Sequence, residues 1–186
     1  MPKKEIRPKR IVIAGPNGSG KTTFTHQVLR HDWSRGCVFI NPDEIARKEF
    51  GDWNLPDAVR KAVSRAQDMR EQCLRERKSM LVESVFSASD KLDVIRRAKE
   101  AEFFIRFFFI GTDNPQINAG RVARRVMDGG HDVPIKKIIS RYHLSTANSA
   151  IAMSLMDRAY GYDNSIDNRD PKKIFRTKEG KLFKNL

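Results

Sequence analysis

Residues 15–22 read Gly15-Pro16-Asn17-Gly18-Ser19-Gly20-Lys21-Thr22 and directly follow the apolar run Arg10-Ile11-Val12-Ile13-Ala14. These residues match the pattern G-x-x-x-x-G-K-[ST] at every fixed position. The preceding run is short enough to be a buried strand, and apolar side chains at Phe24 and Val28 give the residues after the loop an inner helical face. A strand, a glycine-rich loop and a helix in this order predict a loop that surrounds phosphate groups.

The chemistry of this loop suits a nucleoside triphosphate. Glycine backbone lets a ligand approach closely, and successive N–H groups together with the positive end of the following helix face an anion. The Lys21 ammonium would bridge the β- and γ-phosphates, and the Thr22 hydroxyl would bind Mg²⁺. A glycine turn with a chance lysine is the alternative, but the flanking strand and helix argue against it. We expect ATP and Mg²⁺ to be bound by Gly15, Pro16, Asn17, Gly18, Ser19, Gly20, Lys21, Thr22 and Thr23.

Length and charge set the class of protein and of ligand. A chain of 186 residues suits one domain, here 1–186. The net charge of +13 attracts polyanions such as nucleotides, nucleic acids or phosphorylated substrates. Because the basic residues are spread along the whole chain, charge alone does not choose among these ligands, and nucleic acid is not excluded.

The sequence indicates a cytoplasmic protein without a membrane segment. Cys37 and Cys73 have no metal-binding spacing and form no disulfide framework, as expected in a reducing compartment. The N-terminus has no apolar stretch typical of a secretory signal. The most hydrophobic run, 103–110, is interrupted by Arg106 and is too short to span a bilayer.

Strands and helices are expected to alternate along the chain. Short apolar runs predict strands at 10–14, 37–40, 80–82, 103–110 and 159–165. Helical spacing predicts helices at 20–30, 45–50, 57–77, 90–101, 115–128 and 134–156. We also expect a basic lead-in at 1–9, ordered only near its end, loops at 31–36 and 51–56, and a hairpin at 174–183. The predicted fold class is α/β: a P-loop NTPase with a parallel sheet of about five strands, helices on both faces and a C-terminal hairpin.

Two acidic residues follow predicted strands. Asp43 comes after the second strand and Glu83 after the third, at the strand ends where open α/β sheets bind their ligands. Phosphoryl transfer needs a group that receives the proton of the attacking hydroxyl, and Asp43 is the candidate for this base. Glu83 would orient the substrate or hold Mg²⁺ through water. The alternative is that either acid only caps the helix that follows it.

Arginines gather in the predicted helical region 115–156, which we expect to act as a lid. Arg121 and Arg125 are four residues apart on one helical face, Arg124 lies between them, and Arg141 follows on the next helix. Arginine matches the geometry of phosphate and would stabilise the charge of the transferred group. A solvated basic face is the alternative.

Several motifs together resemble the zeta-toxin-like group of P-loop kinases, from residue 9 to about residue 165. They are the phosphate loop, Ile40-Asn41-Pro42-Asp43-Glu44-Ile45-Ala46, Val82-Glu83-Ser84, Arg121 to Arg125, Gly129-Gly130-His131-Asp132-Val133-Pro134 and Tyr162-Asp163-Asn164-Ser165. The Gly-Gly-His-Asp-Val-Pro stretch resembles a branch of predicted bacterial ATPases rather than the zeta toxins proper. Ser84 stands where threonine is more usual.

The resemblance implies an ATP-dependent kinase. Lys21 and Thr22 would contact phosphates and metal, Asp43 would be the base, and Glu83 with Ser84 would bind the acceptor. The implied phosphate clamps are Arg121, Arg125 and Arg141. Zeta toxins phosphorylate a nucleotide-linked amino sugar and are held in check by an antitoxin, so both become expectations for this chain.

The leading hypothesis is transfer of the γ-phosphate of ATP to a hydroxyl of a small molecule such as a nucleotide sugar. One alternative is a polynucleotide kinase, suggested by the positive charge. The other is a module that binds ATP without transferring its phosphate. Phosphate transfer to a small acceptor, salt-dependent oligonucleotide binding, and ATP binding without turnover distinguish the three.

Overall fold

The computed structural model describes residues 7–51 and 55–183. Most of the predicted lead-in and the middle of the predicted loop at 51–56 therefore lie outside the described residues, at 1–6 and 52–54.

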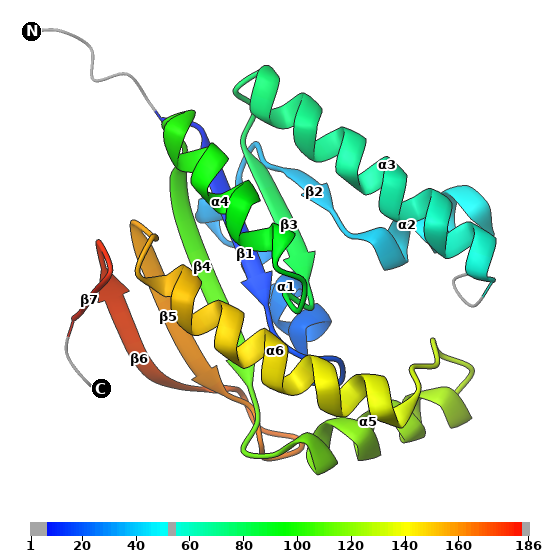
Figure 1. Ribbon diagram of the computed structural model, residues 1–186. Coiled ribbons are helices and arrows are strands. Elements are labelled where there is room, and N and C mark those ends of the chain that lie inside the picture. Colours follow the sequence, from blue (N-terminus) through cyan, green and yellow to red (C-terminus); the bar gives the residue numbers. More distant parts are fainter. Residues whose placement is uncertain (1–6, 52–54, 184–186) are drawn as a thin grey trace, which may run out of the picture.

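Within the described residues, one seven-stranded sheet runs through the protein (Figure 1). Its spatial order is β2 (Val38–Ile40), β3 (Met80–Ser84), β1 (Lys9–Ala14), β4 (Phe104–Gly111), β5 (Arg158–Asp163), β6 (Lys172–Lys178) and β7 (Lys181–Leu182). The first five of these strands are parallel, and the β6–β7 hairpin extends the sheet in antiparallel fashion. The predicted fold class is thus confirmed, and the predicted hairpin adds its two strands to the same sheet.

Helices cover both faces of this sheet. One face carries α1 (Lys21–Leu29) and the short 3-10 helix η1 (Asp32–Ser34). The other face carries α3 (Pro56–Arg75), α4 (Asp90–Glu100) and α6 (Ile135–Met153). The remaining helices are α2 (Pro42–Phe50), which packs against α3, and α5 (Pro115–Met127), which packs against α6. None of the helices in the described ranges is both long and apolar enough to cross a membrane.

Helix α2 begins one turn earlier than the sequence predicted. The side chain of Asn41 accepts hydrogen bonds from the backbone N–H groups of Asp43 and Glu44, and Pro42 occupies the first helical position. An asparagine cap followed by proline is a strong start signal for a helix. As a result, Asp43 lies in the first turn of α2 rather than in a loop.

The central strand β1 is buried on both sides. Ile11 and Ile13 pack against α1, whereas Val12 and Ala14 face the layer of α3, α4 and α6. Such a strand reads as a continuous apolar run because neither face meets water. Since β1 pairs in parallel register with β3 and β4, the carboxyl ends of these strands lie along the same edge. The loop at 15–20 follows β1 at that edge.

Candidate active site

The phosphate loop between β1 and α1 depends on glycine at both ends. Gly15 has φ +154°, and a Cβ atom there would lie 2.2 Å from the carbonyl oxygen of Ile110. Gly20 has φ +91°, and its Cβ would lie 2.3 Å from Nδ2 of Asn164. Side chains at these positions would be strained and would displace the supporting segments. The backbone therefore keeps the open concave shape that a phosphate group requires.

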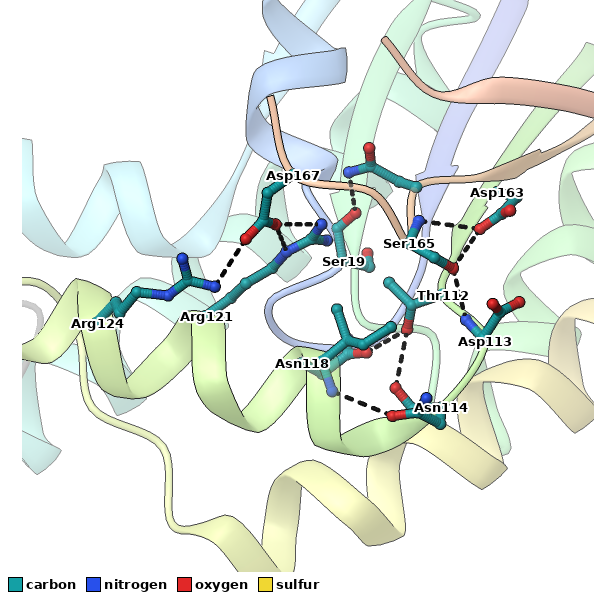
Figure 2. Close-up of polar contacts among 12 residues, drawn as sticks. Ser19, Thr112, Asp113, Asn114, Asn118, Arg121, Arg124, Asp163, Ser165 and Asp167 are labelled. Carbon is teal, nitrogen blue, oxygen red and sulfur yellow. Dashed lines mark hydrogen bonds and ion pairs between the residues drawn. The ribbon is translucent and has the colours of Figure 1, made fainter. Parts of the chain in front are cut away.

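Two asparagines from distant parts of the chain hold the loop. Asn164 donates from Nδ2 to the carbonyl oxygen of Ser19 at 2.8 Å, and Asn118 donates from Nδ2 to that of Asn17 at 2.6 Å. Thr112 in turn donates to the side-chain oxygen of Asn118. Figure 2 shows Ser19, Asn118 and Thr112 at this junction. Segments that follow β4 and β5 therefore support the loop from outside.

Lys21 is buried in this loop and surrounded by charges. Its Nζ donates to the carbonyl oxygen of Pro16 at 2.8 Å, across the concave side of the loop. Burial lowers the pKa of Lys21, Arg125 and Arg141 lower it further, and Glu83 and Asp43 oppose this shift. The predicted base and two of the predicted clamps thus influence the charge of Lys21 electrostatically, while its hydrogen bond goes to Pro16.

Glu83 is buried at the carboxyl end of β3. Its Oε1 accepts a hydrogen bond from the Thr22 hydroxyl at 2.9 Å. Its Oε2 accepts from the Thr25 hydroxyl at 2.9 Å and from Nδ2 of Asn41 at 3.2 Å. The carboxylate is thus fixed beside the threonine that the sequence assigns to the metal. Ser84 lines a cavity together with Val12 and Val82, on the face of the sheet opposite α1, and its Oγ accepts from the backbone N–H of Phe86 at 3.0 Å.

Asp43 and Thr23 both stand at exposed positions near the loop. Asp43 lies in the first turn of α2 with its side chain exposed, while its backbone N–H donates to Asn41. An exposed carboxylate near Lys21 is accessible to an incoming hydroxyl group, as the proposed base must be. Thr23 is exposed in the first turn of α1.

The predicted arginine cluster divides into two groups. Nη1 of Arg141 lies 3.5 Å from Oδ1 of Asn17, which places Arg141 at the phosphate loop. Arg125 donates to the carbonyl oxygen of His131 at 2.7 Å. Arg121 is instead engaged by the Asp167 carboxylate, with its Nη2 at 2.6 Å, and Arg124 donates to the same carboxylate at 2.8 Å (Figure 2).

Sequence reasoning missed several residues that support the site. They are Thr25, Asn41, Asn118, Asn164 and Asp167. Two signals were available: Thr25 follows Thr22 by three residues on one helical face, and Asn164 lies in a stretch already noted as a motif. Asn118 and Asp167 carry no local signal, because their partners are far away in the sequence.

The donor set fits a triphosphate with a magnesium ion. In the part of the chain that the structure describes, no group of three or more His, Cys, Asp or Glu could hold a metal by itself. Mg²⁺ in phosphoryl-transfer sites is usually held by one or two protein oxygens, water and the substrate phosphates. The Thr22 hydroxyl, with Glu83 behind it at 2.9 Å, matches that arrangement.

Comparison with protein families gives a match over almost the whole chain. Residues 1–179 match the family described as Zeta toxin. An uncharacterized protein of Haemophilus influenzae (strain ATCC 51907 / DSM 11121 / KW20 / Rd) is 27% identical over 139 residues, which cover 72% of this chain and 92% of that protein.

Solved structures share the fold at low sequence identity. A chain of the AvrRxo1-ORF1:-ORF2 complex matches 95% of this chain with a TM-score of 0.70 and 18% identity, and this chain spans 60% of its length. A chain of the PezAT chromosomal toxin–antitoxin system of Streptococcus pneumoniae matches 94% of this chain and 73% of its own length, with a TM-score of 0.65 and 14% identity. A chain of the Pnkp1/Rnl/Hen1 RNA repair complex matches 80% of this chain and 47% of its own, with a TM-score of 0.62 and 20% identity.

Proposed function

This chain belongs to the Zeta toxin family, and on that premise we propose that it transfers the γ-phosphate of ATP to a hydroxyl group of a small molecule. The observation that carries the proposal is a phosphate loop with a buried lysine, Lys21, next to a carboxylate, Glu83, that accepts hydrogen bonds from Thr22 and from the Asn41 cap preceding Asp43. Arg141 reaches the same loop, with its Nη1 3.5 Å from Oδ1 of Asn17. This is the combination of cradle, base and cations that phosphoryl transfer requires.

Each group has a distinct role in the proposed reaction. The loop N–H groups and Lys21 bind the β- and γ-phosphates. Mg²⁺, held by Thr22, would neutralise charge between these phosphates. Asp43 accepts the proton of the attacking hydroxyl, and Glu83 with Ser84 orients the acceptor. Arg125 and Arg141 stabilise the negative charge on the transferred group; Arg121 would join them only after leaving Asp167.

We further propose a nucleotide-linked sugar as the acceptor and an antitoxin protein as the partner. The support is the family itself and the shared fold with a chain of the PezAT toxin–antitoxin system. In this proposal residues 1–186 form a single domain in which α5 and α6 act as a lid over ATP. The free cysteines Cys37 and Cys73 suit the cytoplasm, where ATP is plentiful.

The variant Asp43→Asn tests the role of the base. Loss of a general base lowers transfer by roughly 10²- to 10⁴-fold, while ATP binding stays intact because the loop is unchanged. The measurement is transfer of labelled γ-phosphate to nucleotide sugars and to fractions of a metabolite extract, with ATP binding followed by thermal shift. Glu44→Gln, one residue further along the same helix, is the matched control and keeps its transfer rate.

Normal transfer by Asp43→Asn would show that another group receives the proton. Bound ATP without transfer to any acceptor would instead favour the ATP-binding module.

A polynucleotide kinase is the second candidate. It is favoured by the net charge of +13 and by the shared fold with a chain of the Pnkp1/Rnl/Hen1 RNA repair complex. This candidate predicts that oligonucleotides with a 5′-hydroxyl accept phosphate and that their affinity falls steeply with salt. An affinity that barely changes with salt would count against it.

A further inference from the structure

A small cavity whose lining is largely apolar but includes three basic side chains lies on the face of the sheet opposite α1. It opens between β1 and β3 on one side and α3 and α4 on the other, where Figure 1 places α3 and α4 on either side of β3. Its volume is about 20 Å³, and three cationic side chains line it: Arg10, Arg70 and Lys91. Ser84 and Phe86, which follow Glu83 in the sequence, also line it, and the rest of the lining is apolar: Val12, Val82, Val94 and Ile95.

The guanidinium of Arg10 is buried, and one of its donors has no hydrogen-bond acceptor among the residues that the structure describes. Only 4% of Arg10 is exposed, and Nη1 donates to the weak sulfur acceptor of Met80 at 3.4 Å. Its Nε has no hydrogen-bond partner within residues 7–51 and 55–183. Burial and the neighbouring Arg70 lower the pKa of Arg10 to about 10, with Glu71 opposing this shift, so the group remains charged at neutral pH. A buried charge in this state is costly unless something pairs with it.

The acids near this cavity are already engaged by other cations. Glu71 accepts hydrogen bonds from Arg97, and Asp90 pairs with Lys91 at 2.8 Å. The cavity therefore keeps a positive excess, with Arg10 at its floor and Arg70 and Lys91 nearer to solvent.

We propose that this cavity binds the oxyanion group, phosphate or carboxylate, of a small molecule. A volume of about 20 Å³ has room for one or two oxygen atoms beside Arg10. The remaining oxygen atoms of the phosphate or carboxylate would lie at the opening of the cavity, between Arg70 and Lys91. Because Ser84 belongs to both the cavity and the acceptor end of β3, the anion comes either from the acceptor substrate or from a free ligand.

Inorganic phosphate is the probe for the site itself. Phosphate is also expected to bind the phosphate loop, so thermal unfolding is measured in the Lys21→Ala background, with ionic strength held constant by chloride, which is not an oxyanion. Phosphate is expected to raise the melting temperature of Lys21→Ala, and the rise is lost in Lys21→Ala/Arg10→Met. Without phosphate the Arg10→Met change raises the melting temperature, because methionine fills the space without an unpaired charge.

Two rim variants and one control keep this test informative if the Arg10 variant fails to fold. Arg70→Met and Lys91→Met are made in the same Lys21→Ala background. Each is expected to raise, several-fold, the phosphate concentration that gives half of the maximal rise in melting temperature. Lys99→Met, an exposed position on α4 outside the cavity, leaves it unchanged. Equal phosphate stabilisation with and without Arg10, or none in Lys21→Ala, overturns the proposal.

A kinetic experiment on protein that keeps Lys21 identifies the source of the anion. This second experiment rests on the proposed function. If the acceptor supplies the anion, Lys91→Met raises KM for the acceptor several-fold while kcat stays constant. If a free ligand supplies it, KM is unchanged and phosphate still stabilises the protein. The thermal test does not depend on catalysis, so its failure is distinct from a failure of the kinase proposal.

Discussion

The buried carboxylate of Glu83 joins two segments of the active site. Thr22 and Thr25 reach it from α1, and Asn41 reaches it from the cap of α2. Three donors converge on two oxygens, so the carboxylate has little freedom to move. Asp43, two residues beyond Asn41, is thereby held in a fixed relation to the phosphate loop. The acid that the sequence assigns to the acceptor also organises the site.

Replacing Glu83 tests this structural role. In Glu83→Gln an NH₂ group replaces one carboxylate oxygen. This NH₂ group cannot accept a hydrogen bond from the donors that now bond to Glu83, so buried polar groups lose their partners. The expected loss of stability is about 1–3 kcal/mol, measured by urea unfolding. Glu76→Gln, at an exposed position, changes stability by less than about 0.5 kcal/mol. A Glu83→Gln protein as stable as the original would mean that the site rearranges around the amide.

Helix α5 directs its arginines toward different partners. Arg121 and Arg124 are held by Asp167, in the segment that connects β5 and β6, whereas Arg125 donates to the carbonyl oxygen of His131. One donor of Arg121, Nη1, is buried and has no hydrogen-bond partner within the described part of the chain. These two arginines lower the pKa of Asp167, so the ion pairs persist at neutral pH. In the proposed reaction, where Arg121 contacts phosphate, Asp167 would compete with the triphosphate for this arginine.

Removing the charge of Asp167 should release this arginine. In Asp167→Asn we expect the affinity for ATP to rise a few-fold, because Arg121 becomes free to contact phosphate. Isothermal titration calorimetry with a non-hydrolysable ATP analogue measures the change. Asp170→Asn makes the same change of net charge further along the segment and serves as the control. An unchanged or weaker affinity in Asp167→Asn would mean that Arg121 only anchors the segment after β5.

For the molecule as a whole, the alternation of strands and helices was predictable, whereas the long-range contacts of the site were not. Local periodicity predicts that β1, β3 and β4 are strands, but it does not tell which strand lies beside which. The sheet order follows from packing of the whole chain. Likewise, Asn118 and Asn164 bond to loop carbonyls that are 101 and 145 residues away, and no local pattern records such a contact. The loop itself was predictable because its backbone geometry depends on its own glycines.

Ligand binding at that loop should stabilise the whole fold, since the loop is tied to the segments after β4 and β5 as well as to α1. At a concentration of ATP 100-fold above Kd, binding adds about 2.7 kcal/mol. For a chain of this size, that corresponds to a rise in Tm of roughly 5–10 °C, measured by thermal unfolding with ATP and Mg²⁺. Lys21→Ala is expected to remove most of this rise, because it removes the buried cation that we propose to bind the phosphates. Lys48→Ala, at an exposed position on α2, should retain the rise. If Lys21→Ala were protected as well as the original protein, ATP would be binding somewhere other than the glycine-rich loop.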